Sequence, residues 1–324
     1  MNFQKIPVIE DYTHYLDVAF NRAKIRVDQQ RQKTKKKRED AFDHIKTIEE
    51  FRLSSVRDTL TERFNKILRS FPEMNLLSPY YQELIRTTTD YLKIMAACET
   101  LAWAVQTIKT IHYEHNRKLM RARQPEKIHE IRRSFYGRVS SVVEQAKTAL
   151  TALEKARKVM RSYPIIKDLP TVAIAGFPNV GKTTLLSKIS ASKPEIAEYA
   201  FTTKHINMGY MKLDSREIQL IDTPGTLARL DKMNSIEKQA FLAIKYLAHI
   251  IVYIFDPTEP YPLEMQENLL AIIQEEKKQL VLYISKTDEP GKEMVIAKLK
   301  KKYPSIITEP SVLQERLFSL LKKG

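Results

Sequence analysis

The chain reads GFPNVGKT at residues 176–183. A glycine, four further residues and then Gly181-Lys182-Thr183 form the phosphate-binding loop pattern. The apolar run TVAIA before this loop predicts a strand, and TTLLSKIS after it predicts a helix. In that setting backbone N–H groups and the positive end of the helix surround a phosphate, Lys182 contacts the β- and γ-phosphates, and the Thr183 hydroxyl binds Mg²⁺. The alternative is a chance match on an ordinary turn.

Two later segments follow strand-like runs in the order that a nucleotide-binding domain needs. DTPG (residues 222–225) ends the run REIQLI, and SKTD (residues 285–288) follows LVLYI. Asp222 is expected to hold Mg²⁺ through a water, and the Gly225 amide to contact the γ-phosphate. The Asp288 carboxylate can accept hydrogen bonds from N1–H and the 2-amino group of guanine, a donor pair that adenine lacks. Alone, SKTD is also compatible with a helix N-cap followed by a turn.

The connection between the phosphate loop and DTPG contains a pair of threonines. The segment AEYAFTTKHINMG, residues 197–209, leads into the second expected strand. A threonine here can give its hydroxyl to Mg²⁺ and its amide to the γ-phosphate, which makes the loop a sensor of the terminal phosphate. Thr202 and Thr203 are both candidates.

Composition limits the class of protein. The 324 residues are 43% hydrophobic and 29% charged, as in a globular protein long enough for two domains. The longest apolar run, YLAHIIVYIF, is too short to span a bilayer, and residues 1–10 lack the apolar core of a signal peptide. A single cysteine, Cys98, excludes an internal disulfide. We therefore expect a cytoplasmic protein without a membrane partner.

The net charge of +15 is concentrated in the first half of the chain. Residues 1–163 hold 32 Lys/Arg and 20 Asp/Glu, whereas residues 164–324 hold 22 and 19. The basic residues are densest in QQRQKTKKKRED and HNRKLMRARQPEK, and HEIRRSFYGR interleaves arginines with Phe135 and Tyr136. Such a surface suits RNA, with cations on phosphates and aromatic rings on unpaired bases. The alternative is a set of solvated helix faces, with Phe135 in the core.

The two halves also differ in periodicity, which predicts two domains, residues 1–163 and 164–324. The first has one glycine and helical apolar spacing in three blocks, 10–71, 78–121 and 126–161, and predicts an antiparallel helical bundle. Its first block is either one long helix or two helices broken near residues 33–38. The second predicts a doubly wound α/β domain with one antiparallel strand pair and ligands at the carboxyl ends of its strands. The expected strands are 171–176, 205–213, 216–222, 249–255, 280–285 and 305–308.

The motifs GFPNVGKTTLLSKIS, YAFTTKHINMGYM, IDTPGTL and SKTD together resemble the Nog (nucleolar G-protein) family, within the Obg-like group of translation-factor-related GTPases. The resemblance covers essentially the whole chain. It implies a helical bundle followed by a Ras-like P-loop GTPase domain, with GTP or GDP and Mg²⁺ as ligands. It also implies a role in large ribosomal subunit assembly, with the helical domain contacting ribosomal RNA. The long C-terminal extension of nucleolar members is missing, so we expect a shorter, archaeal-like version, and we expect it to be a monomer.

The resemblance selects Thr203, the second threonine of FTT, as the Mg²⁺ ligand beside Thr183 and Asp222. The residues expected to act in catalysis are Lys182, Thr203 and Gly225. The residues expected to contact the nucleotide are Gly176, Phe177, Pro178, Asn179, Val180, Gly181, Lys182, Thr183, Thr184, Phe201, Thr202, Thr203, Asp222, Thr223, Pro224, Gly225, Ser285, Lys286 and Asp288.

Three positions depart from related GTPases or qualify the mechanism. Ser285 stands where the family has asparagine, and the lost amide predicts nucleotide binding weaker by about 1 kcal/mol. Thr226 stands where Ras-like enzymes have a water-orienting glutamine, which predicts slow hydrolysis. Asn179 either helps to hold a K⁺ ion, as in related GTPases, or only tolerates the backbone geometry of the loop.

Two function hypotheses follow. The first is a GTP-dependent switch on ribosomal RNA in large-subunit assembly. The second is a regulatory GTPase that acts on a protein partner through the helical domain, with no RNA role.

Overall fold

A computed structural model of the chain describes residues 3–34, 41–163, 165–190, 195–197, 206–213, 216–223, 235–258 and 261–322. These residues form two compact units that are not contiguous in sequence. The helical unit comprises Phe3–Glu73 and Thr89–Arg161, and the α/β unit comprises Met74–Thr88 and Ser162–Gly324.

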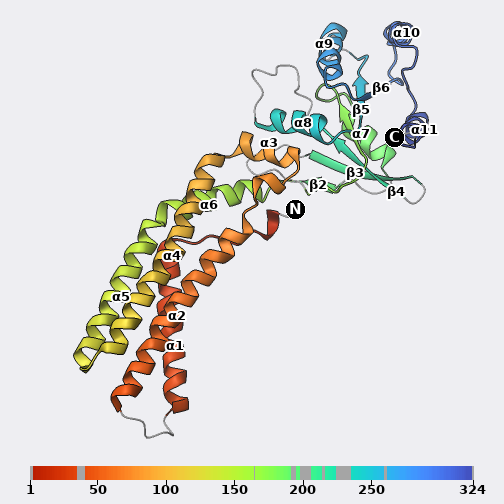
Figure 1. The fold of residues 1–324 in the computed structure, drawn as a ribbon. Coiled ribbons are helices and arrows are strands. Elements are labelled where there is room, and N and C mark those ends of the chain that lie inside the picture. Colours follow the sequence, from red (N-terminus) through yellow and green to blue (C-terminus); the bar gives the residue numbers. More distant parts are fainter. Residues whose placement is uncertain are drawn as a thin grey trace. The chain divides into compact units, whose positions relative to one another are not determined.

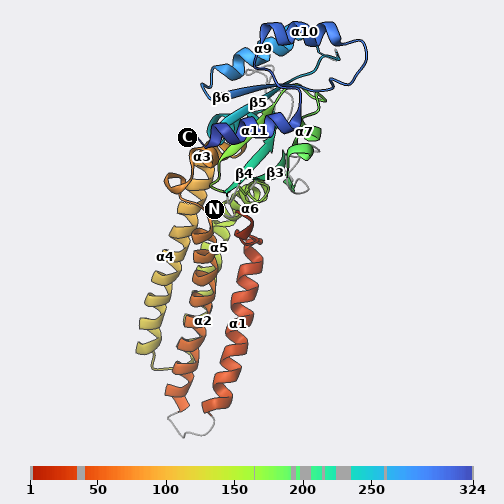
Figure 2. The same ribbon diagram turned by 90° about the vertical axis from the view of Figure 1, so that its right-hand side faces the viewer.

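The helical unit is a bundle of long helices (Figures 1 and 2). Its apolar positions repeat at helical spacing, as in α1, where Tyr15, Ala19, Ala23 and Val27 recur every fourth residue and are all buried. Helix α2 packs on α1 and α4, and α4 packs on α5 and α6. The elements are η1 (Phe3–Lys5), α1 (Tyr12–Thr34), α2 (Ala41–Ser70), α4 (Tyr91–Arg121), α5 (Pro125–Gln145) and α6 (Lys147–Met160).

The expected helical blocks are present, and each contains two helices. The block 10–71 consists of α1 and α2, which is one of its two expected forms. The block 78–121 breaks at Asp90, whose side chain accepts a hydrogen bond from the Lys93 amide and starts a new helix. The block 126–161 bends at Ala146, whose amide bonds to both Val142 and Val143 carbonyls. Local capping and bifurcated bonding therefore divide runs that have continuous apolar periodicity.

The α/β unit is built on a six-stranded mixed sheet in the order β2-β3-β4-β1-β5-β6. Strands β4, β1, β5 and β6 are parallel, whereas β2–β3 and β3–β4 are antiparallel. The central strands β1 and β5 are buried along their whole length. The elements are η2 (Met74–Leu76), α3 (Pro79–Thr88), β1 (Thr171–Ala175), α7 (Lys182–Ile189), β2 (Glu195–Ala197), β3 (Ile206–Leu213), β4 (Arg216–Asp222), α8 (Ser235–Tyr246), β5 (Ile250–Phe255), α9 (Leu263–Gln274), β6 (Gln279–Ile284), α10 (Glu293–Lys302) and α11 (Pro310–Leu321).

The α/β unit confirms the predicted doubly wound fold and differs in two details. Glu195–Ala197, which is outside the expected strands, adds to β3 as the edge strand β2. The expected strand 305–308 is a single parallel bridge between Ile307 and Tyr283.

Helix α3 belongs to the α/β unit, although it lies within the first half of the sequence. It packs on α8, and its side chains hold the segment that leads into β1. The Tyr81 hydroxyl accepts a hydrogen bond from the Ile166 amide at 2.9 Å, and Thr88 Oγ1 bonds the Tyr163 hydroxyl at 2.5 Å. A contiguous division at residue 163 therefore does not follow the packing. Among the described helices, none combines the length and apolar character that a membrane span requires.

Candidate nucleotide-binding site

The site lies where the four parallel strands end. Because β4, β1, β5 and β6 run in the same direction, the residues that follow them lie along one edge of the sheet (Figure 1). The strand order places the end of β4 on one side of the phosphate loop and the ends of β5 and β6 on the other. Segments far apart in sequence are thereby brought to one edge.

The phosphate loop adopts backbone conformations that require its glycines. Gly176 has φ +152°, and a Cβ there would lie 3.0 Å from the Ile254 carbonyl oxygen. Gly181 has φ +90°, and Asn179 is held at φ 62°, in the left-handed region that asparagine tolerates. Asn179 is exposed, which leaves its side chain free of packing constraints.

The Lys182 side chain lies within this loop and is only 7% exposed. Its ammonium donates hydrogen bonds to the carbonyl oxygens of Gly176 at 3.2 Å and Phe177 at 2.6 Å. Helix α7 begins at Lys182, so the amides of its first turn point into the same loop. A fixed ammonium and a helix N-terminus in a tight glycine loop together form an anion-binding arrangement.

Two oxygen-bearing side chains meet beside the loop. Thr183 Oγ1 donates to Asp222 Oδ2 at 2.5 Å, and Asp222 is 6% exposed. The amide and hydroxyl of Thr223 both donate to the Ile174 carbonyl, at 3.1 and 2.8 Å, and so fix the end of β4 against β1. Hydroxyl and carboxylate oxygens are the ligands that Mg²⁺ prefers, so this pair fits the ion. Within the described ranges no group of three or more His, Cys, Asp or Glu side chains forms another metal-binding cluster.

The SKTD segment lies on the other side of the loop. Ser285 is buried, and its amide and hydroxyl donate to the Phe255 carbonyl at 3.0 and 3.2 Å. A Cβ on Gly181 would lie 3.6 Å from Ser285 Cβ, so the serine lies against the phosphate loop. Lys286 has φ 50°, and Asp288 is exposed. The segment is anchored at its start and opens to solvent at Asp288.

Asp256, directly after β5, is a site residue that motif reasoning missed. Its side chain is fully buried, and Oδ2 accepts a hydrogen bond from Lys286 Nζ at 2.7 Å. Its other oxygen accepts from the amide and hydroxyl of Thr258, at 2.9 and 2.6 Å. The pair holds the Lys286 side chain in one position, since a buried carboxylate keeps its cation close. A carboxylate directly after a buried strand was the signal that could have found it.

Gln266, on α9, fixes the backbone of Asp256. The Gln266 side chain accepts from the Asp256 amide and donates to the Asp256 carbonyl, both at 2.9 Å. The Tyr253 hydroxyl donates to the Gln266 carbonyl at 2.6 Å, and burial raises the pKa of Tyr253, so the phenol stays protonated. The Phe177 ring stacks on Tyr261 with centroids 4.5 Å apart. These contacts join the phosphate loop to the chain between β5 and α9.

Several expected site residues lie outside the described residues. They are Phe201, Thr202, Thr203, Pro224 and Gly225. Of the remaining loop residues, Val180 is buried, Pro178 is half-buried and Thr184 is exposed.

The aromatic residues expected beside the basic helix segments face inward. Phe135 is fully buried, and Tyr136 stacks on Phe20 with centroids 4.5 Å apart. Arg132 and Arg138 form ion pairs with Glu49 at 3.1 Å and Glu114 at 2.6 Å. Phe135 is therefore part of the core, as the alternative interpretation expected, while contact of the basic helix faces with RNA stays a prediction.

Comparison with known families accounts for both parts of the chain. Residues 3–167 match the family described as the NOG1 N-terminal helical domain, which covers half of the chain. The chain belongs to the NOG1 family. Residues 171–286 match the family described as 50S ribosome-binding GTPase. The resemblance stated from the motifs is thus confirmed, and the second unit of this NOG1-family chain is a P-loop GTPase domain.

Individual relatives agree with this assignment. The Methanocaldococcus jannaschii protein MJ1408 is 38% identical over 76% of this chain and 71% of its own length. Nucleolar GTP-binding protein 1 of Kluyveromyces lactis is 28% identical over 96% of this chain and 49% of its own length. The same-named protein of Saccharomyces cerevisiae is 28% identical over 89% and 45%. The chain therefore spans about half the length of these nucleolar relatives.

Proposed function

We propose that this chain binds GTP, hydrolyses it slowly and acts as a nucleotide switch in assembly of the large ribosomal subunit. The observation that carries the proposal is the meeting of the phosphate loop, Asp222 and the SKTD segment at one edge of the sheet. Membership of a family whose relatives are named nucleolar GTP-binding proteins supports the ribosomal role.

Different groups of the chain bind the phosphates and the Mg²⁺ ion. Loop amides and the Lys182 ammonium bind the β- and γ-phosphates, and Lys182 exchanges its carbonyl partners for phosphate oxygens when the nucleotide enters. Thr183 and Asp222, together with Thr203, would hold Mg²⁺, and the Gly225 amide and Thr203 would contact the γ-phosphate. Bound Mg²⁺ would neutralise charge on the phosphate oxygens.

Base recognition belongs to the SKTD segment. Asp288 accepts the two guanine donors, and the Lys286 stem lies over the base, held there by Asp256. Ser285 contributes a single hydrogen-bonding group. Guanine preference therefore rests on one exposed carboxylate, which lies three residues after the buried anchor Ser285.

Hydrolysis is proposed to be slow because Thr226 cannot orient the attacking water as glutamine does. Asn179 is proposed to help hold a K⁺ ion that supplies positive charge to the transition state. We expect kcat to rise when K⁺ replaces Na⁺ at constant ionic strength, and equal rates in the two salts would remove this part of the proposal.

The helical part, residues 1–163, is proposed to contact ribosomal RNA, and residues 164–324 to bind the nucleotide. The excess of Lys and Arg over Asp and Glu in residues 1–163 favours a polyanionic partner. The protein is proposed to act as a cytoplasmic monomer.

The function is tested by calorimetry and co-sedimentation. Calorimetry with GTP, GDP and ATP should give binding to the guanosine nucleotides and none to ATP. Co-sedimentation with large ribosomal subunits should differ between GDP and a non-hydrolysable GTP analogue, and Lys182→Ala should abolish that difference. Binding of ATP but not GTP, or sedimentation indifferent to nucleotide, would contradict the proposal.

A specific observation keeps a protein partner as the second candidate. Leu92, Met95 and Trp103 lie on one side of α4 and are 80%, 41% and 45% exposed. An exposed apolar row of this kind is typical of a protein contact. RNA binding by the chain that is absent, or indifferent to salt, would favour this candidate.

A further inference from the structure

An open cavity of about 410 Å³ lies at the turn between α4 and α5. Four cationic side chains line it, and all four are exposed. They are Lys118, Arg121, Arg123 and Lys127. Ala122 is buried and Ile131 is half-buried, so these two side chains form an apolar floor beneath a cationic rim. We call this cavity the α4–α5 tip.

The rim cations are poorly neutralised. Within the described part of the bundle, the side chains of Arg121 and Arg123 form no ion pair, whereas Lys127 bonds the exposed Glu130 at 2.8 Å. The nearest carboxylate to Lys118 on α4, Glu114, is bonded to Arg138 at 2.6 Å. From residue 117 to residue 133 the chain has seven Lys/Arg and two Glu. The tip therefore carries a local positive charge that favours an anionic ligand.

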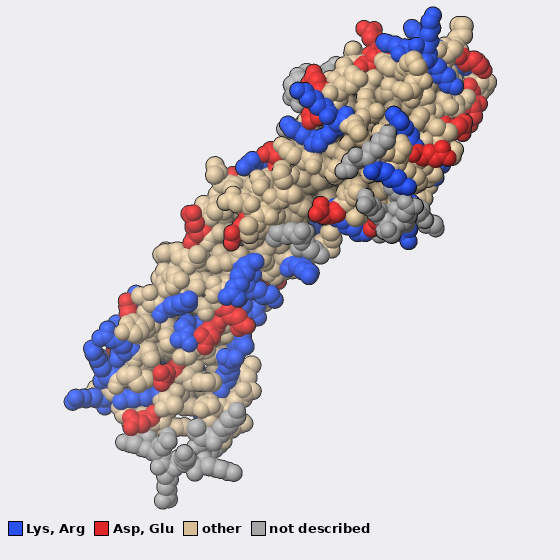
Figure 3. All heavy atoms as spheres, turned by 45° about the vertical axis from the view of Figure 1, so that its right-hand side comes forward, with Lys and Arg blue, Asp and Glu red and all other residues tan. Residues whose placement is uncertain are grey.

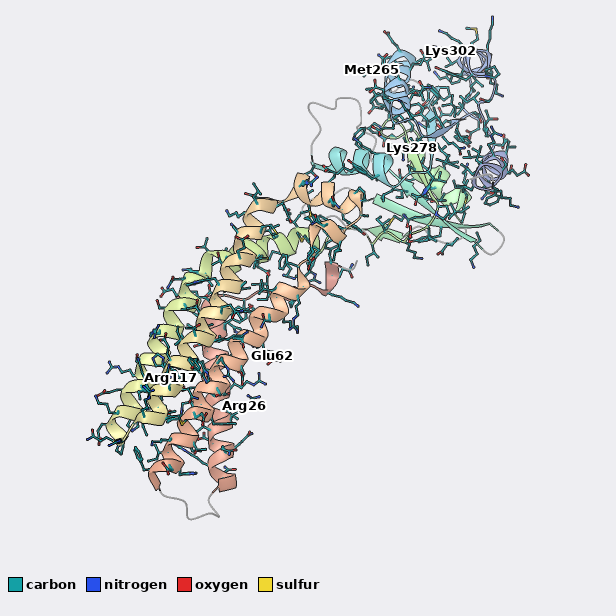
Figure 4. The ribbon with its side chains drawn as sticks, in the orientation of Figure 1. Arg26, Glu62, Arg117, Met265, Lys278 and Lys302 are labelled. Atoms are coloured by element: carbon teal, nitrogen blue, oxygen red, sulfur yellow. The ribbon has the colours of Figure 1, made fainter. Side chains whose placement is uncertain are left out.

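A row of side chains on α4 leads away from the cavity. Tyr113, Arg117 and Arg121 are spaced by four residues and so lie on one side of the helix. Tyr113 is 62% exposed, and the Arg117 guanidinium lies 5.7 Å from the centre of its ring. Figure 4 shows Arg117 on α4 in the half of the bundle that carries the turn. This row places an exposed aromatic ring at one end, next to two cations.

The surroundings of the tip are also basic. The last turn of α1, the first turn of α2 and the α4–α5 turn lie at the same end of the bundle in both ribbon views (Figures 1 and 2). Lys and Arg side chains gather over this end of the molecule, with some acidic side chains among them (Figure 3). An extended polyanion could therefore continue beyond the cavity.

We propose that the α4–α5 tip binds an unpaired segment of RNA. Its phosphates contact Lys118, Arg121 and Arg123, one base enters the cavity onto Ala122 and Ile131, and a neighbouring base stacks on Tyr113. This inference rests on the RNA contact of the proposed function and assigns its place. Unpaired RNA fits better than duplex, because the apolar floor and the aromatic ring need base faces that a duplex keeps stacked.

The test uses the full chain and two fluorescent RNA hairpins, one with a bulge of unpaired nucleotides and one with the bulge removed. Fluorescence anisotropy should show tighter binding of the bulged hairpin. The variant Arg121→Gln/Arg123→Gln should lose about tenfold or more in RNA affinity at moderate salt. The negative slope of log K against log salt should become less steep by about two. Tyr113→Ala should lose about fivefold, on the bulged hairpin only.

The matched control is Lys298→Gln/Lys301→Gln, which removes two exposed cations from α10 in the α/β unit. It should keep the parent affinity and salt slope. Circular dichroism should show that all variants are folded. Equal losses in the control and the tip variant, or a tip variant within twofold of the parent, would overturn the site. Equal binding of the two hairpins would overturn the unpaired-base assignment.

These outcomes are separable from those of the proposed function. If the chain binds GTP and co-sediments with subunits, but the tip substitutions leave its RNA affinity unchanged, the tip proposal is contradicted and the proposed function stands. A chain that binds no guanosine nucleotide loses the function, while the ranking of the variants on RNA still decides the tip.

Discussion

The two units place their polar side chains by different rules. In the α/β unit, Asp222 ends β4, and Asp256 and Ser285 directly follow β5 and β6, so the sheet alone brings them to one edge. In the helical unit, the cations of the α4–α5 tip come from two helices and the turn between them, and their convergence depends on how the helices are rotated and packed. A site at strand ends can therefore be recognised from short sequence motifs. A site on a helical bundle can be recognised only from the tertiary structure.

The strongest test of the motif-coded site is Lys182→Ala. Loss of the ammonium removes charge-assisted hydrogen bonds to two phosphates, and we expect GTP affinity to fall by about 3–4 kcal/mol, a few hundredfold or more. Calorimetry measures the change. The control is Lys188→Ala, at an exposed position of the same helix, which should bind GTP as the parent does. Unchanged GTP affinity in Lys182→Ala would show that the phosphate-loop motif does not mark a nucleotide site in this chain.

Base recognition gives the next largest effect. Asp288→Asn replaces an acceptor of two hydrogen bonds with a group that presents a donor, so GTP affinity should fall by about 2–3 kcal/mol. ATP binding should not change. Glu289→Gln alters the neighbouring exposed carboxylate and is the matched control. A loss of the same size in both variants would show a general charge effect and no guanine contact.

Asp256→Asn tests a strand-end residue that no motif marks. Asp256 directly follows β5 and acts on the nucleotide through the side chain of Lys286. Without its negative charge Lys286 loses a charge-assisted bond, and we expect GDP affinity to fall about tenfold, or about 1.4 kcal/mol. The dissociation rate of a fluorescent GDP analogue measures this effect. Thr258→Val removes a hydroxyl bond to the same carboxylate and should have a smaller effect in the same direction. A melting temperature lowered with the GDP dissociation rate unchanged would show that Asp256 serves only stability.

The last effect is one on stability alone and concerns a buried polar group of the bundle. Arg57 donates to His112 Nδ1 at 3.0 Å, which leaves the proton on Nε2 to donate to Ser54 Oγ at 3.0 Å. Burial, and then the Arg57 charge, lower the pKa of His112 from 6.5 to about 4, against a smaller opposing effect of Asp58. The unfolded chain therefore takes up the proton first, and stability is lost as the pH falls from 6.5 towards 4.

The full shift sets an upper limit of about 2 kcal/mol on the loss of unfolding free energy at pH 5 relative to neutral pH. Urea unfolding at several pH values measures it. His112→Asn should flatten the pH dependence, while His14→Asn, at an exposed position, should leave it unchanged. An identical slope in the parent and His112→Asn would mean that other groups carry the acid sensitivity.

Much of the α/β unit could be predicted because its signals are local. Short apolar runs bounded by loops defined β1, β3, β4, β5 and β6 to within one or two residues. The strand β2 was not predicted, because an edge strand of three residues has no periodicity of its own and forms only on β3. Asp256 was missed for a related reason, since nothing in the sequence near it shows that Lys286 will be its partner.

The sequence by itself determined that a phosphate loop, a DTPG segment and an SKTD segment follow strands in the order of a GTPase, and that the first half of the chain is helical and basic. Only the tertiary structure decided that α3 belongs to the α/β unit, that Phe135 is core, and which cations share one cavity. The physical reason is the range of the interactions involved. Strand ends and glycine conformations depend on neighbouring residues, whereas burial and charge clustering on helices depend on contacts between residues far apart in the chain.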